Sequence, residues 1–383
     1  VLTVLGTYLG PDDLVSERLL ADIAAHELLF DRIRCLPLHA ALAAVTASAL
    51  PRMNHIVRCH PPALTLRACD VFDTMVEKLW SELSRTTPDS TTQKVATLPH
   101  RHGGAGFTRM ALVAPHAYGA SVDSCSGAKN TDSQHTRCDR MFAALRSILA
   151  ADDSVRHAHL DECASKGTAT WMRNLTGVER WIRDDCVSAA LRLRLDRPHL
   201  DWSAGQQCPG CRAPLDHTGS IVQHLRGCTA IRGSNCSSAA ATVTRALGDI
   251  CNAACVQHQI AQPRDYAMKH CTQCQSYVGV GDVADHCTRL GCDAAALDRA
   301  RIRGPDKRIF LQSGSIVVDT TAVGPATASS CASSLDRVFA IRGEQKDRLY
   351  RTAVEAGDEE FVVMAMTPNG AVCNGTIHVL RRI

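Results

Sequence analysis

The chain has 383 residues, of which 45% are hydrophobic and 21% are charged, an ordinary composition for a globular protein of two or three domains. The formal net charge is only +3, so no protein-wide positive field favours nucleic acid and any basic surface has to be local. No apolar run reaches the roughly 18 residues of a membrane span, and no signal-peptide pattern opens the chain, which favours a soluble, non-secreted protein. The opening at Val1 in a strand-like run is typical of a piece of a longer protein.

The first half of the chain is predicted to be mainly helical. Residues 1–10 form a strand-like run that ends in a glycine turn. After it, apolar residues recur at the spacing of helices that bury one face, interrupted by prolines and polar loops, of which 123–137 is the richest in Ser, Gly and Asn. The predicted helices cover residues 12–57 (two helices, the second beginning at Pro37), 68–83, 140–151 and 169–195.

The last of these helices and the residues after it carry five arginines that are candidate contacts for a nucleic-acid backbone. They are Arg180, Arg183, Arg192, Arg194 and Arg197. A solvated helix face explains the same residues equally well, so the pattern leaves both interpretations open.

Nineteen cysteines, an odd number in a chain without a signal peptide, argue against a disulfide framework. Their spacing favours metal binding instead. Two residues separate Cys208 from Cys211, and His224 and Cys228 follow at the spacing of a zinc finger. Two thiolates on a tight turn and a His and Cys one helical turn apart can bind one tetrahedral zinc ion. The competing donors are His217 and Cys236.

A second set repeats this frame and predicts a second zinc site. Its donors are Cys271, Cys274, His286 and either Cys287 or Cys292. Cys292 is the better fourth ligand, because adjacent residues such as His286 and Cys287 point in different directions. Both sets have a full complement of protein ligands, so the zinc ions are predicted to be structural staples rather than hydrolytic centres.

Two apolar runs near the C-terminus, Ile309–Leu311 and Ile316–Val318, predict a β-hairpin with a turn that contains glycine. Asp306 precedes the first strand and Asp319 ends the second. A hairpin brings such residues to one end of a sheet, where two carboxylates can share Mg²⁺. The alternative is that both aspartates merely punctuate the strands.

Beyond the hairpin, residues 340–350 predict a helix with Lys346 and Tyr350 on one face, and residues 361–366 predict a strand. A lysine near two metal-binding carboxylates would orient an attacking water or stabilise the negative charge of a phosphorane. Taken alone, Lys346 is better explained as a solvated helix residue. The fold class is predicted to be α+β, with a helical N-terminal half, a zinc-stapled middle and a small α/β domain at the C-terminus.

The order of these features resembles the C-terminal part of a non-LTR retrotransposon polyprotein that carries a restriction-like endonuclease. The resemblance covers nearly the whole chain and rests on the order of several short motifs, none of them decisive alone. The helical half supplies Leu5-Gly6-x3-Gly10, Leu36-Pro37, Pro51-Arg52-x3-Ile56-x-Arg58, Pro61-Pro62, Phe72-Asp73 and Leu98-Pro99-x3-Gly103-Gly104-x-Gly106. The second half supplies Ala190–Leu195 ahead of Cys208-x2-Cys211 and His224-x3-Cys228, then Pro305-Asp306, Asp319-x-Thr321 and Lys346-x3-Tyr350.

The resemblance implies a domain organisation. Residues 1–122 would be a helical region like a reverse transcriptase thumb, and residues 123–200 a helical connector. Residues 201–236 would be a CCHC zinc knuckle, and residues 237–383 an endonuclease domain of the PD-(D/E)XK type with the second zinc site inserted. The polymerase palm would lie upstream of Val1, so no polymerase active site is expected in this chain.

The resemblance also implies a mechanism. The endonuclease would nick a chromosomal target, and the freed 3′ hydroxyl would prime reverse transcription of the element's RNA. Asp306 and Asp319 would bind magnesium or manganese, and Lys346 would assist the attack of water. The implied partners are target DNA, element RNA and the upstream palm, with no membrane, and the implied location is the nucleus. The zinc knuckle and the arginines before it would help to hold the nucleic acid.

Two departures from the family pattern weaken the nuclease interpretation. Gln262-Pro263 stands where many relatives have Glu-Pro, and Gly304 stands where relatives usually have Arg before Pro-Asp. Loss of a carboxylate weakens metal binding. The second hypothesis is therefore a catalytically inactive, zinc-containing remnant that binds DNA or RNA.

Overall fold

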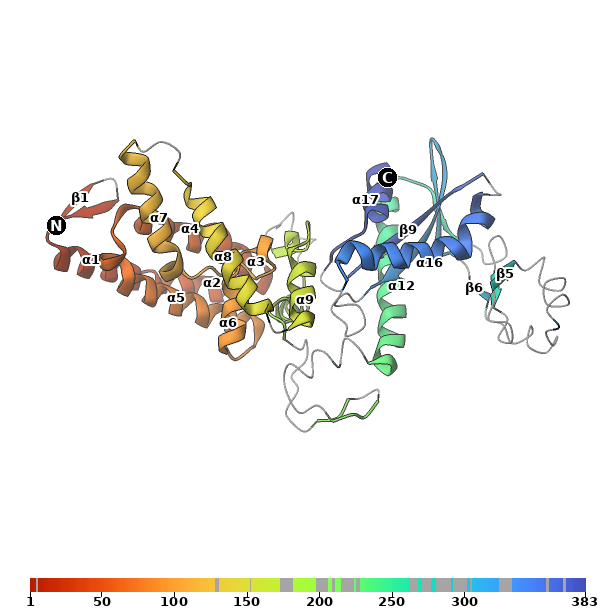
Figure 1. Ribbon diagram of the computed structural model, residues 1–383, viewed down its shortest axis with the longest axis horizontal. Coiled ribbons are helices and arrows are strands. Elements are labelled where there is room, and N and C mark those ends of the chain that lie inside the picture. The colour runs from red at the N-terminus through yellow and green to blue at the C-terminus, as the bar shows by residue number, and fades with distance from the viewer. Residues whose placement is uncertain are drawn as a thin grey trace. The chain divides into compact units, whose positions relative to one another are not determined.

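The fold is taken from a computed structural model, which divides the chain into two compact units, a helical one and one built on a β-sheet (Figure 1). The structure describes residues 1–4, 6–127, 131–151, 153–172, 182–197, 206–208, 211–214, 224, 228–261, 268–270, 277–279, 291, 302–303, 305–323, 333–355, 358–367 and 370–383.

The helical unit begins with an antiparallel hairpin of β1 (Leu2–Val4) and β2 (Thr7–Leu9), in place of the single predicted strand. Helices and single turns follow. They are α1 (Asp12–Ala24), α2 (Glu27–Arg34), α3 (Leu38–Ala44), the π-helical turn η1 (Val45–Ala49), α4 (Leu50–Cys59), α5 (Pro62–Ser84), α6 (Ser90–Thr97), the 3-10 turn η2 (His100–His102), α7 (Met110–Cys125), α8 (Gln134–Ala150), α9 (Ser154–Ala164), the 3-10 turn η3 (Thr170–Met172) and α10 (Asp184–Arg194).

Helix α5 lies at the centre of this unit and illustrates why the sequence folds as predicted there. Pro62 occupies the first turn, where a helix does not need the missing N–H. Phe72, Val76 and Leu83 are all buried on one face. The ring of Phe72 packs edge-to-face on that of Phe30 from α2, with centroids 5.7 Å apart. The predicted amphipathic helix over residues 68–83 is confirmed.

The later helices of this unit share the core of the earlier ones. Phe142 of α8, Leu160 of α9 and Leu191 of α10 are buried in the same cluster as Phe72. The predicted boundary at residue 122 therefore does not separate two cores. The predicted loop over 123–137 is also shorter than expected, because the Ser133 hydroxyl accepts a hydrogen bond from the N–H of Thr136 and starts α8 early.

The glycine-rich turn after α6 allows backbone segments of the helical unit to pack closely together. A Cβ at Gly103 would lie 2.2 Å from the carbonyl oxygen of Leu160, and one at Gly104 would lie 2.1 Å from that of Leu98. Only glycine permits these approaches of backbone to backbone. The carbonyl of Gly104 in turn accepts a hydrogen bond of 2.7 Å from Nε of the buried Arg194. The turn thus joins α6, α9 and α10.

The second unit contains a four-stranded mixed sheet in the order β3-β7-β8-β9. Its elements are α12 (Thr229–Ala253), β3 (His258–Ile260), β7 (Lys307–Leu311), β8 (Gly314–Ala322), α16 (Leu335–Glu355), β9 (Glu360–Met366) and α17 (Asn374–Arg382). A separate antiparallel sheet has the order β5-β4-β6, with β4 at Met268–His270, β5 at Tyr277–Gly279 and β6 at Ile302–Arg303. The chain is thus a mixture of helices and sheet, consistent with the predicted α+β class.

Helices cover both faces of the four-stranded sheet (Figure 1). Strand β8 pairs antiparallel with β7 and parallel with β9, so the chain needs a crossover between β8 and β9, and α16 provides it. Alternate residues of β8 face opposite sides. Val318 packs with Leu247 of α12 and Val379 of α17, whereas Val317 packs with Tyr350 of α16. The predicted hairpin is confirmed, with strands longer than expected at both ends.

Candidate functional site

Asp319 lies on the central strand β8, on the side of the sheet that α16 covers, and only 3% of its surface is exposed. The pKa of its carboxyl is raised to about 6, chiefly by burial and to a smaller extent by the negative charge of Asp306. The ammonium of Lys346 opposes both effects. A buried carboxylate whose ionised form is costly is a group that a cation stabilises strongly.

Lys346 reaches this carboxylate from α16. Its Nζ lies 2.7 Å from Oδ2 of Asp319, and its side chain is 27% exposed, so the ammonium also meets solvent. One turn later, the ring of Tyr350 has its centroid 5.7 Å from the same Nζ. The predicted i, i+4 pair on one helix face is confirmed, and it points the lysine at the strand rather than leaving it as a solvated surface residue.

Asp306 directly precedes β7 and lies beside Asp319 of the neighbouring strand β8. The pairing of Lys307 with Val318 ends the β7–β8 ladder, so the two aspartates follow at adjacent places on neighbouring strands. Oδ2 of Asp306 accepts hydrogen bonds from the backbone N–H of Thr320, at 2.6 Å, and from the Thr320 hydroxyl, at 2.5 Å. Sequence reasoning did not predict the contact between Asp306 and Thr320. Strand alternation places the side chain of Thr320 on the face of the sheet opposite to that of Asp319.

These residues suit a hard divalent cation. Two carboxylates on neighbouring strands, one of them buried, have the oxygen donors that Mg²⁺ and Mn²⁺ prefer. Lys346 supplies one positive charge beside Asp319, and a cation would balance the remainder. Asp319 was predicted to end its strand, but it lies within β8, opposite Val363 of β9, in a ladder that continues to Ala322. Lys346 contacts it there, and Asp306 lies just before the start of the neighbouring strand β7.

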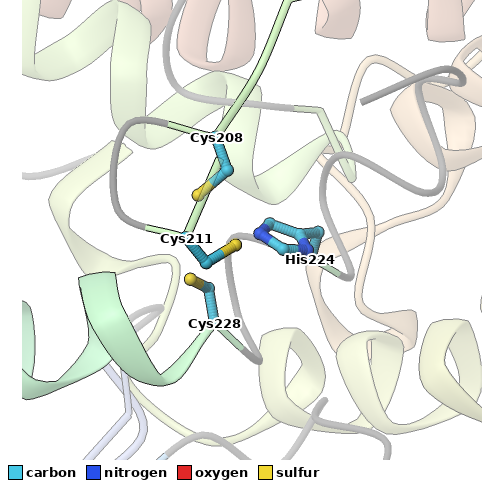
Figure 2. Close-up of side chains that lie close together, drawn as sticks. All are labelled: Cys208, Cys211, His224 and Cys228. Carbon is cyan, nitrogen blue, oxygen red and sulfur yellow. The ribbon is translucent and has the colours of Figure 1, made fainter. Parts of the chain in front are cut away.

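The four donors of the first predicted zinc site also lie together. The Sγ atoms of Cys208, Cys211 and Cys228 and a ring nitrogen of His224 are all within 4.8 Å of one another (Figure 2). Donors around a tetrahedral zinc ion are separated by about 3.3 to 3.8 Å. Three thiolates and one imidazole are a typical donor set for zinc, so the residues fit that ion.

Local backbone structure positions two of these donors. The carbonyl of Cys208 accepts a hydrogen bond from the N–H of Arg212, and the N–H of Cys208 donates to the carbonyl of Ala213. Arg212 adopts a left-handed conformation with φ of +60°. These bonds close the turn that carries both Cys208 and Cys211. Cys228 is the N-cap residue, directly before the first residue of α12.

Several predicted residues lie outside the part of the chain that the structure describes. They are Arg180, His217, Gln262, Cys271, Cys274, His286, Cys287, Cys292 and Gly304. The second zinc site and the two departures from the nuclease pattern therefore stay predictions from sequence.

Arg194 does not fit the predicted nucleic-acid contact. It is 1% exposed, and its guanidinium donates to the carbonyls of Gly104 and Cys163. These bonds hold the charge inside the helical core, away from any ligand at the surface. Three other arginines of the group have partners within the chain. Arg183 pairs with Asp185, Arg192 donates to the carbonyl of Arg85, and Arg197 pairs with Asp89.

Comparison with protein-family models found no match, and comparison with curated protein sequences found none either. Among the helices that the structure describes, none is both long enough and apolar enough to cross a membrane. The functional argument therefore rests on the geometry of the two sites.

Proposed function

We propose that the sheet unit is a divalent-metal-dependent DNA endonuclease and that the chain is the C-terminal part of a non-LTR retrotransposon protein. The observation that carries the proposal is the 2.7 Å contact between Nζ of Lys346 and Oδ2 of Asp319, beside Asp306. The contact joins a helix to a buried strand position, which a solvated lysine would not do. The order of strands and helices in this unit supports the same interpretation.

In this proposal, Asp306 and Asp319 hold magnesium or manganese through their carboxylate oxygens. When bound, the cation neutralises charge on the phosphodiester and lowers the pKa of water. Lys346 keeps its ammonium beside Asp319, where it can orient the attacking water or stabilise negative charge that develops on the phosphoryl oxygens. The nick leaves a 3′ hydroxyl on the target DNA, which would prime synthesis from element RNA. A nuclear location follows from that role.

A nicking assay tests the endonuclease. Supercoiled plasmid is incubated with the full chain and Mg²⁺ or Mn²⁺, and wild type is compared with Asp306→Ala and Asp319→Ala. Nicking by wild type that both substitutions abolish supports the proposal. No nicking by any of the three proteins, with DNA retained in a gel shift, supports the alternative of an inactive zinc-containing binding protein. Gln262, which replaces a carboxylate of the family pattern, is the sequence feature that favours this alternative.

We further propose that the cluster of Cys208, Cys211, His224 and Cys228 holds one structural zinc ion. All four positions around the metal are filled by protein, so the site has no place for a reacting water. Metal analysis of the purified chain should find at least about one zinc per chain, and Cys208→Ser with Cys228→Ser should remove it. Well under one zinc in wild type contradicts the assignment.

A further inference from the structure

The carboxylate of Asp306 is the end of a chain of hydrogen bonds that crosses the edge of the sheet. Thr320 of β8 contributes two of these bonds, through its N–H and its hydroxyl. The hydroxyl oxygen of Thr320 also lies 2.7 Å from that of Thr244, a residue of α12. Thr320 is 4% exposed, so water has little access to the hydrogen bonds that its hydroxyl makes.

Two hydroxyls and one carboxylate are thus connected. The Thr320 hydroxyl donates to Oδ2 of Asp306. The hydroxyls of Thr320 and Thr244 lie within hydrogen-bond distance of each other, and either can be the donor. A hydrogen bond to a carboxylate is charge-assisted, and a neighbouring hydroxyl in the same network strengthens it.

The geometry also distinguishes the two oxygens of Asp306. Oδ2 accepts both bonds from Thr320, which occupy its lone pairs. Within the described part of the chain, no hydrogen-bond donor is assigned to Oδ1. One oxygen is therefore used to hold the carboxylate in place, and the other is left to bind a cation.

From this arrangement we infer that Thr320, supported by Thr244, is a positioning residue that presents Oδ1 of Asp306 as a single-oxygen ligand to the divalent cation. The inference rests on the proposed endonuclease function and adds two residues that do not touch the metal. Groups that hold a metal ligand in place commonly change metal affinity by about 10- to 100-fold when they are removed.

The test separates metal affinity from the maximal rate in the zinc-loaded full chain. Thr320→Val keeps the shape of the side chain and the backbone bond but removes the hydroxyl. It should raise the Mn²⁺ concentration for half-maximal nicking by about 10-fold or more. The maximal rate at saturating Mn²⁺ should stay within about threefold of wild type. Calorimetric titration with Mn²⁺ alone should show the same loss of affinity.

Two related variants sharpen the result. Thr320→Ser restores a hydroxyl and should return the half-saturating Mn²⁺ concentration to within about twofold of wild type. Thr244→Val leaves the direct bond to Asp306 and removes only its support, so a smaller change of about threefold is expected.

Thr376→Val is the matched control. Thr376 is a buried threonine of the same unit, 2% exposed, whose hydroxyl donates to the carbonyl of Ala365 at 3.2 Å. Its loss should lower the melting temperature without moving the half-saturating Mn²⁺ concentration. If Thr320→Val lowers the maximal rate and leaves the Mn²⁺ requirement unchanged, the inference is overturned while the endonuclease proposal stands. If wild type neither binds Mn²⁺ nor nicks DNA, the proposed function fails and the inference falls with it.

Discussion

Each unit contains one buried aspartate with a raised pKa, and the two differ in what surrounds the carboxylate. Asp73 of α5 is 5% exposed and Asp319 of β8 is 3% exposed. Burial raises the pKa of each to about 6. By burial and pKa alone the two residues are equivalent candidates for a functional group.

Their partners separate them. The carboxylate of Asp73 accepts hydrogen bonds from the N–H groups of Met110, at 2.7 Å, and Ala111, at 3.1 Å, and so caps the first turn of α7. Both N–H groups lie in the first turn of α7, where a helix has no carbonyl of its own to accept them. Asp319 has a lysine side chain at 2.7 Å and a second carboxylate on the neighbouring strand. Asp73 also has a side-chain cation nearby, Arg109, with Nε 3.7 Å from Oδ2. The difference is therefore the pair of backbone N–H donors, which use the Asp73 carboxylate as a helix cap, whereas no backbone donor is among the groups that shift the pKa of Asp319.

The largest expected effect tests this distinction directly. Asp319→Asn should reduce Mn²⁺-dependent plasmid nicking on the order of 1,000-fold or more, because the cation loses a charged ligand worth several kcal/mol in the transition state. Asp73→Asn should leave nicking unchanged. Equal losses in the two variants, measured under conditions where both stay folded, would contradict the separation of roles.

The second prediction concerns Lys346. Lys346→Met should lower the maximal nicking rate by about 100-fold, since a positioned charge beside the reacting group is lost. It should also raise the pKa of Asp319, because the ammonium is the group that lowers it. The pH of half-maximal nicking should therefore move upward in a pH–rate profile. Arg348→Met, on the exposed side of the same helix, is the control and should leave both quantities unchanged.

Whether a feature could be predicted from the sequence depends on how far apart along the chain its residues lie. Helix α5 and the β7–β8 hairpin follow from periodicity within one segment, and the CCHC cluster follows from spacing within some twenty residues. The Lys346–Asp319 contact was expected only from the order of motifs that the resemblance supplies, because Lys346 taken alone is better explained as a solvated helix residue.

Other contacts leave no local signal. For Arg194 the sequence left two interpretations open, a contact with nucleic acid and a solvated helix face. In the structure it is buried and donates a hydrogen bond to the carbonyl of Gly104, ninety residues earlier, so neither interpretation describes it. Thr244 meets Thr320 across 76 residues, and threonine in a helix or a strand has no pattern that indicates such a pairing. Sequence reasoning thus found the charged members of the candidate site and missed the hydroxyls that hold them.

The third prediction concerns how much the Asp73 cap contributes to the stability of the helical unit. Asp73→Ala leaves the buried N–H of Met110 and that of Ala111 without their acceptor, and should lower the stability of the helical unit by about 2 kcal/mol. Hydrogen exchange should increase first at the start of α7. Asp70→Ala, at an exposed position one turn earlier on α5, should change the stability by no more than about 0.5 kcal/mol. A loss spread evenly over both units would argue against a local cap.

The fourth prediction is a pH dependence that both aspartates share. Their pKa values in the folded chain, about 6, lie above the ordinary value of 3.8. Between these two pH values the folded state binds more protons than the unfolded state, so the free energy of unfolding decreases as the pH rises through this window and levels off above it. The slope for each fully titrating carboxyl approaches about 1.4 kcal/mol per pH unit.

Replacing one aspartate at a time shows which unit each part of this pH dependence comes from. Asp73→Asn should flatten the pH dependence of hydrogen exchange in the helical unit alone, and Asp319→Asn should flatten it in the sheet unit alone. All four tryptophans precede α12, so tryptophan fluorescence cannot follow the sheet unit and exchange is the better measurement. Mn²⁺ provides the final distinction. It should reverse the slope of the sheet unit, because a cation that binds ionised Asp319 lowers the pKa of that carboxyl, and it should leave the slope caused by Asp73 untouched.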